Sequence, residues 1–229
     1  VEVNELKIFT PGKVPDYVQK WQLPRENETD LILFSTHADD EHLFFAGLLP
    51  YYGAELDYEV LVVYLTGHQN FNLIRTHELL NGLWAVGIDT YPVIGTFTDF
   101  RKPTIEETYA CFLQFGETKE MILEYVTEQI RRFKPKVVVG HDFAGEYGHG
   151  QHMVYAEVVA EALELTNDPA QFPHLAEKYG LWDVPKAYFH LYEENEIIMD
   201  WDRPLESFDG ETAFAVSIYR GFQMHKTQI

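Results

Sequence analysis

The sequence predicts an α/β sandwich built around a mainly parallel sheet. Short, nearly continuous apolar runs recur along the chain, as in 31–35, 58–65 and 136–139, and segments with helical periodicity separate them. Continuous apolar runs are typical of strands covered on both faces, as in a parallel sheet. The alternation of strands with helices favours right-handed crossovers that place helices on both sides of one sheet.

The predicted elements follow an irregular lead-in, 1–30, in which prolines recur. We expect strands at 31–35, 58–65, 90–94, 136–139, 187–191 and 197–199. We expect helices at 43–52, 73–86, 118–133, 151–165 and 213–224. Segments 95–116 and 167–185 are expected to be loops with short helical pieces or turns. Because no repeat or domain boundary is evident, residues 1–229 are predicted to form a single domain.

The composition limits the classes of partner. With 46% hydrophobic and 24% charged residues the chain is typical of globular proteins, and 37 acidic against 17 basic residues give a net charge of −20. Such a charge repels nucleic-acid backbones and anionic membrane surfaces, so we expect no nucleic-acid partner. The single cysteine, Cys111, excludes an intrachain disulfide.

The apolar runs are too short for a membrane span, which needs ~20 residues. The chain starts at Val1 and not at a methionine, so either a leader has been removed or this is a domain of a longer protein. We expect a soluble protein that is cytoplasmic or exported after leader removal. The compartment and the oligomeric state stay open.

Ionisable residues concentrate in Ser35–Gly47, whose sequence STHADDEHLFFAG directly follows the first predicted strand. Two further strands end in similar turns: TGHQN follows residue 65, and GHDFAGEYGHGQH follows residue 139. In open parallel sheets, ligands collect beyond the carboxyl ends of the strands. All three turns are therefore expected at one edge of the sheet, where they would hold a metal or a phosphate.

The spacing of the histidines favours a metal. His149 and His152 are three residues apart at the start of a predicted helix, and His37 and Asp40 have the same spacing in the first turn. Two histidines and one carboxylate are the ligand set of many catalytic zinc sites, and His37, Asp40 and His152 could supply it. A phosphate site is less well supported, because neither GxxxxGK[ST] nor GxGxxG follows a predicted strand.

Short motifs along the chain are also shared with a known family. The THADDE segment, Thr36–Glu41, is similar to an [AP]HPDDE turn, and YGHGQH, Tyr147–His152, is similar to YGHxxH. Further matches are Arg75 with Glu78 for RxxE, Asp99 for a loop aspartate, and HKTQ, His225–Gln228, for HxSQ. With these motifs the sequence resembles the PIG-L/LmbE-like family of zinc-dependent N-acetylglucosaminyl de-N-acetylases. The resemblance implies a three-layer sandwich with a Rossmann-like sheet.

The resemblance also implies a function and a ligand set. It makes His37, Asp40 and His152 the ligands of Zn²⁺, or of another divalent transition metal such as Fe²⁺. The implied activity is removal of an acetyl group from an N-acetylglucosamine-type sugar or conjugate. Two alternatives stay open: hydrolysis of another amide, such as a sugar-linked thiol conjugate, and a catalytically silent module that binds a metal or a glycan.

The remaining matched residues receive roles in the same way. The resemblance makes Asp39 the general base, and His149 the general acid or the stabiliser of the oxyanion. Tyr147 would assist at the tetrahedral intermediate, and Arg75 and Asp99 would bind the substrate. These roles agree with the chemistry, because a zinc-held water needs a base and the carbonyl oxygen gains charge as that water attacks.

Several positions depart from the family pattern or have no assigned role. Ala38 replaces the family's proline, which leaves the turn less stiff, and Gly150 and Gln151 replace the common proline and aspartate between the two histidines. His68 either contacts the substrate or is an ordinary loop histidine. Glu146 either supports a ligating histidine or is a solvated loop acid.

Overall fold

The computed structural model describes residues 8–15, 17–67 and 73–229. Among these residues, five parallel strands form one sheet in the order β3-β2-β1-β4-β5. The strands are β1 (Leu31–Ser35), β2 (Val60–Thr66), β3 (Val93–Phe97), β4 (Val137–Gly140) and β5 (Lys186–Phe189). The predicted α/β class and parallel sheet are confirmed.

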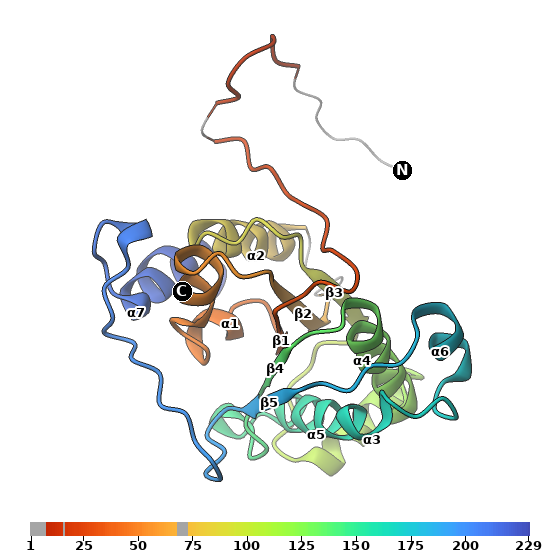
Figure 1. The fold of residues 1–229 in the computed structure, drawn as a ribbon. Helices are drawn as coiled ribbons and strands as arrows, with labels where there is room; N and C mark the ends of the chain where they lie inside the picture. Colours follow the sequence, from red (N-terminus) through yellow and green to blue (C-terminus); the bar gives the residue numbers. More distant parts are fainter. Residues whose placement is uncertain (1–7, 16, 68–72) are drawn as a thin grey trace.

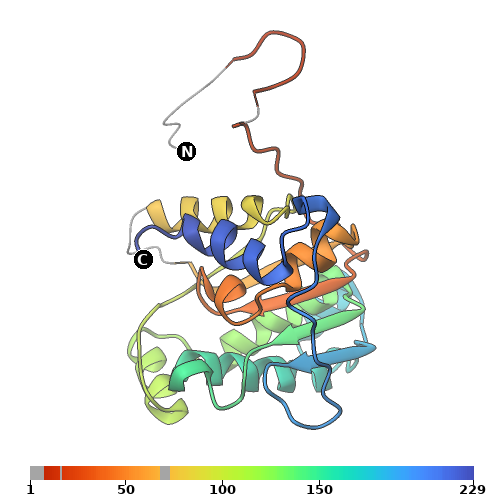
Figure 2. The ribbon, with the colours of Figure 1, turned by 90° about the vertical axis from the view of Figure 1, so that its left-hand side faces the viewer.

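Helices cover both faces of this sheet and give the three layers visible in Figure 1 and, turned by 90°, in Figure 2. The first helical layer contains α1 (Asp40–Leu43), η1 (Leu49–Glu55), α2 (Ile74–Ala85), η4 (Glu206–Phe208), α7 (Ala213–Ala215), η5 (Val216–Gly221) and η6 (Phe222–Met224). The second contains α3 (Ile105–Gln114), α4 (Lys119–Phe133) and α5 (Gly150–Leu165), with α6 (Pro173–Tyr179) beside α4. The short η3 (Glu146–Gly148) leads into α5.

Strand β1 shows why the apolar runs are continuous. Leu31 and Leu33 belong to the core beneath the first helical layer, whereas Ile32 and Phe34 belong to the core beneath the second. Successive side chains of a strand point to opposite faces, so a sheet covered on both sides requires apolar residues at every position.

Two expected elements have different bounds. The helix expected at 43–52 is divided, because α1 ends at Leu43 and η1 begins only at Leu49. Gly47, which lies between them, has a φ of 89°, a left-handed conformation that interrupts a helix. The strand expected at 90–94 begins at Val93, because Thr90 forms an isolated bridge with Gln22 of the lead-in instead.

Other elements differ from the expectations in extent or in type. Helix α3 is a ten-residue helix in segment 95–116, where a loop with short helical pieces was expected, and α6 lies in segment 167–185, where a loop with turns was expected. Thr104 caps α3 by accepting a hydrogen bond from the Glu107 backbone N–H over 3.2 Å. The expected strand at 197–199 does not form, and the side chains of Ile197 and Ile198 are 61% and 84% exposed. The closing helix at 213–224 is present as three consecutive pieces, α7, η5 and η6.

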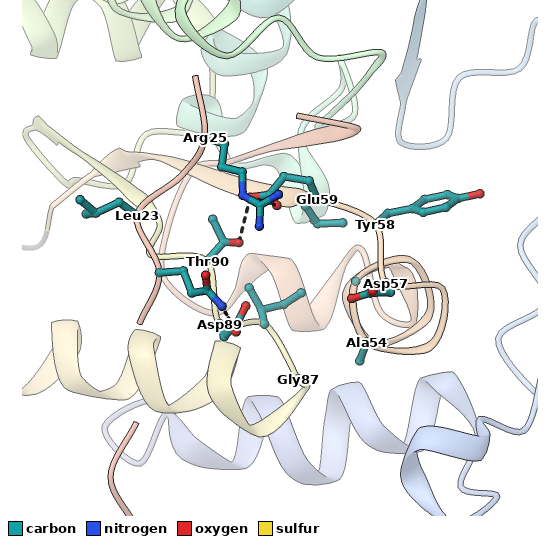
Figure 3. A pocket seen from close by; sticks show the side chains of 13 residues that line it. Leu23, Arg25, Ala54, Asp57, Tyr58, Glu59, Gly87, Asp89 and Thr90 are labelled. Carbon is teal, nitrogen blue, oxygen red and sulfur yellow. Dashed lines mark hydrogen bonds and ion pairs between the residues drawn. The ribbon is translucent and has the colours of Figure 1, made fainter. Parts of the chain in front are cut away.

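Two opposite edges of the sheet carry polar groups. The carboxyl edge bears the turns that follow β1 and β4, which are neighbours in the sheet. A pocket at the amino edge, shown in Figure 3, lies beside Glu59, which immediately precedes β2. Its polar groups bond to one another: Thr90 Oγ1 donates to Glu59 Oε1 over 3.3 Å, and Gln22 Nε2 donates to Asp89 Oδ2 over 3.1 Å. The histidine clusters therefore lie at the other edge.

In the described part of the chain, every helix falls short of the length and apolar character that crossing a membrane requires.

Candidate metal centre

The turn after β1 is closed by one of its own side chains. The backbone N–H of His37 donates to Asp40 Oδ2 over 2.8 Å, which draws the carboxylate of Asp40 back over the turn. Between them Asp39 has a φ of 116°, a conformation that L-residues rarely adopt. Such strain persists only where the surroundings hold it, and it concentrates at functional sites. His37 and Asp40 are therefore held close together at the end of β1.

The second group of residues is placed by the start of α5. His149 is the N-cap of this helix, and its Nδ1 accepts a hydrogen bond from the Gln151 backbone N–H over 3.3 Å. His152 follows in the first turn of the helix and is fully buried. Because β1 and β4 are adjacent, the start of α5 lies against the turn after β1.

The three predicted ligands converge on one point. His37 Nδ1 lies 3.1 Å from Asp40 Oδ2 and 3.1 Å from His152 Nε2, and His152 Nε2 lies 3.1 Å from Asp40 Oδ2. Ligand atoms about 2.0 to 2.2 Å from a tetrahedral zinc ion are roughly 3.3 to 3.6 Å apart. The triangle is slightly smaller than this, and a single ion could therefore reach all three atoms. The residues form a candidate His/Asp metal site.

The second nitrogen of each ring is held by a polar partner. Gln151 Nε2 donates to the Thr98 carbonyl over 2.8 Å, which turns Gln151 Oε1 toward His37 Nε2 at 3.1 Å. Glu146 Oε2 lies 2.8 Å from His152 Nδ1. These acceptors favour protons on His37 Nε2 and His152 Nδ1, so the lone pairs of His37 Nδ1 and His152 Nε2 face the common point. This is the tautomer pair that metal binding requires.

The charges at this point favour a cation. Although burial opposes the charged form of His37, the carboxylate of Asp40 raises the pKa of His37 to about 10. Burial likewise disfavours the charged form of Asp40, yet His152 and His37 hold its pKa well below the usual range. The surroundings therefore stabilise positive charge, which a metal ion would supply in place of a proton.

The carboxylate of Glu146 contacts several histidines next to the candidate site. His141 Nδ1 lies 2.7 Å from Glu146 Oε2, and His190 Nδ1 lies 3.0 Å from Glu146 Oε1. His141 Nε2 accepts a hydrogen bond from the Thr36 backbone N–H over 2.9 Å, which ties β4 to the turn after β1. Glu146 was expected to be either a support of a ligating histidine or a solvated loop acid. Its side chain is buried and lies against His152, a position that agrees with the first interpretation.

Asp39, His149 and Tyr147 border the metal triangle. Burial, followed by the neighbouring carboxylate of Asp40, raises the pKa of Asp39 to about 7. Burial, followed by the charge on His37, lowers the pKa of His149 to about 3. A neutral His149 that accepts at Nδ1 carries its proton on Nε2. The ring of Tyr147 lies 5.6 Å from that of His149 and is more than half exposed, at the mouth of the site.

The residues predicted to bind substrate contact the protein itself. Arg75 is buried, and its Nη2 donates to the Ala38 carbonyl over 2.6 Å and lies 3.9 Å from Asp39 Oδ1. Asp99 Oδ1 lies 3.4 Å from His37 Nε2. Substrate binding by Arg75 and Asp99 stays a prediction. His68 lies outside the residues that the structure describes.

Gln151 and His141 had no role predicted from the sequence. From the sequence, Gln151 was identified only as a residue that stands where the family pattern has aspartate. In the structure its side-chain amide oxygen lies against His37 Nε2. His141 follows β4 directly, so the rule that ligands collect at the carboxyl ends of strands points to it. The contact of Gln151 with His37 spans 114 residues of sequence and has no local signal.

Comparison with known proteins gives one family. The family model described as PIG-L, GlcNAc-PI de-N-acetylase, matches residues 32–163. The 1D-myo-inositol 2-acetamido-2-deoxy-alpha-D-glucopyranoside deacetylase 1 of Catenulispora acidiphila is 27% identical over 185 residues, which cover 72% of this chain and 56% of that protein. The corresponding deacetylase of Streptomyces scabiei is 22% identical, with 76% of this chain and 59% of that protein covered. The chain thus spans under two thirds of the length of these relatives.

Solved structures share the fold at low identity. The N,N'-diacetylchitobiose deacetylase of Pyrococcus horikoshii superposes with a TM-score of 0.61 at 15% identity, covering 89% of this chain and 72% of that one. A 4-carboxy-2-hydroxymuconate hydratase of Pseudomonas putida has a TM-score of 0.53 at 14% identity, covering 87% and 84%. Because this fold also occurs in a hydratase, it does not by itself decide the reaction. The match of the family model over more than half of the chain shows that the protein belongs to the PIG-L (GlcNAc-PI de-N-acetylase) family.

Proposed function

We propose that the chain is a metal-dependent hydrolase that removes the acetyl group from an N-acetylglucosamine-type sugar or conjugate. The observation that carries the proposal is the triangle of His37, Asp40 and His152, with three edges of 3.1 Å, beside a carboxylate that is not part of it. Two imidazoles and one carboxylate fit Zn²⁺ best, and the same donors also suit Fe²⁺. Amide hydrolysis at such a site requires a base that is not itself a metal ligand, and Asp39, next to Asp40 in the turn, is placed to be that base.

The chain's own residues supply the proton transfers. A divalent cation held by His37, Asp40 and His152 would polarise the acetamide carbonyl and acidify a water molecule. Asp39, whose pKa is near neutrality, takes the proton of the attacking water and returns it to the departing amine. The Nε2–H of His149 and the hydroxyl of Tyr147 donate hydrogen bonds to the carbonyl oxygen as it gains charge.

The substrate class rests on the relatives. The two relatives described above are named as deacetylases of a 2-acetamido-2-deoxy-glucopyranoside, and the solved neighbour as a diacetylchitobiose deacetylase. All of these substrates carry an acetamido group on a pyranose. We therefore propose an acetamido sugar as the substrate, oriented by Asp99, which lies beside His37, and by Arg75, which lies beside Asp39.

The test is acetate release from a panel of substrates by the metal-loaded chain. The panel contains N-acetylglucosamine, N,N'-diacetylchitobiose, an inositol-linked acetamido glucoside and a sugar-linked thiol amide. We expect acetate from at least one acetamido sugar, and a loss of about 10² to 10⁴-fold in kcat for Asp39→Asn with its metal content unchanged. Hydrolysis of the thiol amide alone would move the assignment to another amide. Full activity of Asp39→Asn would contradict the proposed role of Asp39 as the general base.

A further inference from the structure

A second cluster of possible ligands lies away from the metal triangle. Glu41 and His42 follow Asp40 in α1, and His225 comes from the segment after η6 near the end of the chain. The side chains of Glu41, His42 and His225 are all fully buried. Neither the ligand triangle nor the proton transfers described above use them.

The distances within this cluster suit one cation. His42 Nε2 lies 3.4 Å from Glu41 Oε1, and His225 Nε2 lies 3.8 Å from the same oxygen. Ligand atoms about 2.0 to 2.2 Å from a tetrahedral zinc ion are separated by roughly 3.3 to 3.6 Å. One donor atom from each of the three residues falls within 4.8 Å of the others. The two edges at Glu41 Oε1 are therefore wider than those of the first triangle, and all three donor atoms lie close enough for one ion to bind them after small side-chain movements.

A glycine leaves space between the two rings. A Cβ atom built on Gly82 would lie 2.7 Å from His42 Nε2, 2.8 Å from His225 Nε2 and 3.3 Å from the Gly221 carbonyl oxygen. Both ring nitrogens and one backbone oxygen thus face the same spot over α2, which any side chain at residue 82 would fill. The carbonyl oxygen of Gly221 faces that spot as a fourth donor atom, beside two ring nitrogens and one carboxylate oxygen.

Polar atoms of Glu41 and His42 lack the hydrogen-bond partners that burial normally requires. Within the described residues, Glu41 Oε1 and both ring nitrogens of His42 have no hydrogen-bond partner. Glu41 Oε2 is already used, because it accepts a hydrogen bond from the Asp39 backbone N–H over 2.9 Å. Burying polar atoms without partners is costly, and a bound cation would satisfy Glu41 Oε1 and His42 Nε2 at once.

We propose that Glu41, His42 and His225 hold a second divalent transition-metal ion, with Zn²⁺ favoured by the two imidazoles and one carboxylate. The ion joins α1, which continues the turn bearing Asp39 and Asp40, to the C-terminal segment. It is enclosed by α2 and η5 and has a structural role. The site stands independently of the reaction proposed above.

The direct test is the zinc content of the full chain after chelation, reloading with Zn²⁺ and removal of excess metal. We expect two equivalents for the wild type, and one equivalent each for His225→Gln and His37→Gln. His77→Gln, on the exposed face of α2, is the matched control and keeps two equivalents. One equivalent in both the wild type and His225→Gln would overturn the second site while leaving the first intact.

Two further measurements cover variants that fail to fold. Gly82→Ala fills the spot between the rings and keeps all three ligands, so we expect one equivalent; two equivalents would overturn the proposal. Anomalous scattering at the zinc edge from crystals of the loaded wild type needs no substitution. A peak beside Gly82 supports the second site and its absence overturns it, whereas a missing peak at His37, Asp40 and His152 counts against the proposed function alone.

Discussion

Arg75 Nη2 donates a hydrogen bond to the Ala38 carbonyl over 2.6 Å, and Ala38 directly precedes Asp39 with its φ of 116°. Arg75 Nη1 lies 3.9 Å from Glu78 Oε2, and Glu78 accepts hydrogen bonds from the Thr227 backbone N–H and hydroxyl over 2.8 and 2.7 Å. The turn that carries the proposed base is thus supported by α2, and α2 by the end of the chain. The hydrogen bond from Arg75 to the Ala38 carbonyl also stiffens a turn that has alanine where the family pattern has proline.

Replacing Arg75 tests this support. In Arg75→Lys the charge is kept, but a lysine lacks the planar donor group that reaches both Ala38 and Glu78. We expect kcat for acetate release to fall by about tenfold or more, because small displacements of a catalytic group are costly, while metal content is unchanged. Arg220→Lys, where the arginine pairs with Glu211 on the surface, is the control. An unchanged kcat in Arg75→Lys would contradict the supporting role.

Gln151→Leu removes the nearer of two acceptors at His37 Nε2 and keeps the volume of the side chain similar; Asp99 Oδ1 remains 3.4 Å from that nitrogen. With only this longer contact the proton of His37 is directed to Nε2 less strongly, and the orientation of the ring is less well fixed. We expect the metal dissociation constant to rise by about 10 to 100-fold, as for other residues that orient metal ligands. The measurement is metal competition with a chromogenic chelator. Gln114→Leu at the exposed end of α3 serves as the control, and equal affinities of the two variants would count against this role.

Glu146→Gln places an amide where the carboxylate now meets three histidines. Because Glu146 Oε2 lies 2.7 Å from His141 Nδ1 and 2.8 Å from His152 Nδ1, the NH₂ of a glutamine in that position would oppose a ring N–H. We expect metal affinity to fall by about 10 to 100-fold, and the free energy of unfolding of the metal-free chain to fall by about 1 to 3 kcal/mol. Chemical denaturation and metal titration check the two effects. A variant that binds metal as tightly as the wild type would refute this prediction.

Gly150→Ala tests why proline is absent between the two histidines of α5. A Cβ atom at residue 150 would lie 2.7 Å from the Thr104 carbonyl oxygen and 2.9 Å from that of Lys102, and would also meet Thr108 Oγ1. In addition, the Gly150 backbone N–H donates to the Lys102 carbonyl over 2.8 Å, which proline cannot do.

We expect Gly150→Ala to lower the free energy of unfolding by about 1 to 3 kcal/mol, as overpacked sites do, and Gly150→Pro to lower it further. Urea denaturation followed by circular dichroism measures both variants. Glu177→Ala, at an exposed position of α6, is the control and is expected to have little effect. Stability equal to the wild type in Gly150→Ala would contradict the crowding.

The core strands were predictable because the sheet is covered on both faces. β1 matched its expected bounds, and continuous apolar runs gave β2 and β4. The full length of helix α3 was not predicted, because segment 95–116 has no clean period and only short helical pieces were expected there, although Thr104 followed by Glu107 is a capping signal. The segment at 197–199 was taken as a strand from three apolar residues, but Ile198 packs against no strand and stays 84% exposed.

The ligand triangle could be predicted in part from local spacing. His37 with Asp40, and His149 with His152, are close in sequence, and the rule for strand ends brings the two pairs together. The supporting contacts could not be predicted, because Gln151 with His37 and Thr227 with Glu78 depend on side-chain directions across more than 100 residues of chain. Local sequence carries no information about such directions.

The order of strands in the sheet has a consequence for assembly of the chain. β1 and β4 lie side by side, yet more than 100 residues separate them along the chain, including β2, β3 and the helices α1, η1, α2, α3 and α4. A nascent chain that ends before β4 would carry two of the three triangle ligands, so tight metal binding begins only once α5 has docked. Metal added during refolding then acts on a late, long-range contact and shifts the equilibrium toward the native order of strands by mass action. The proposed ion would thereby stabilise chains in which β4 and α5 have docked beside β1 over chains in which they have not.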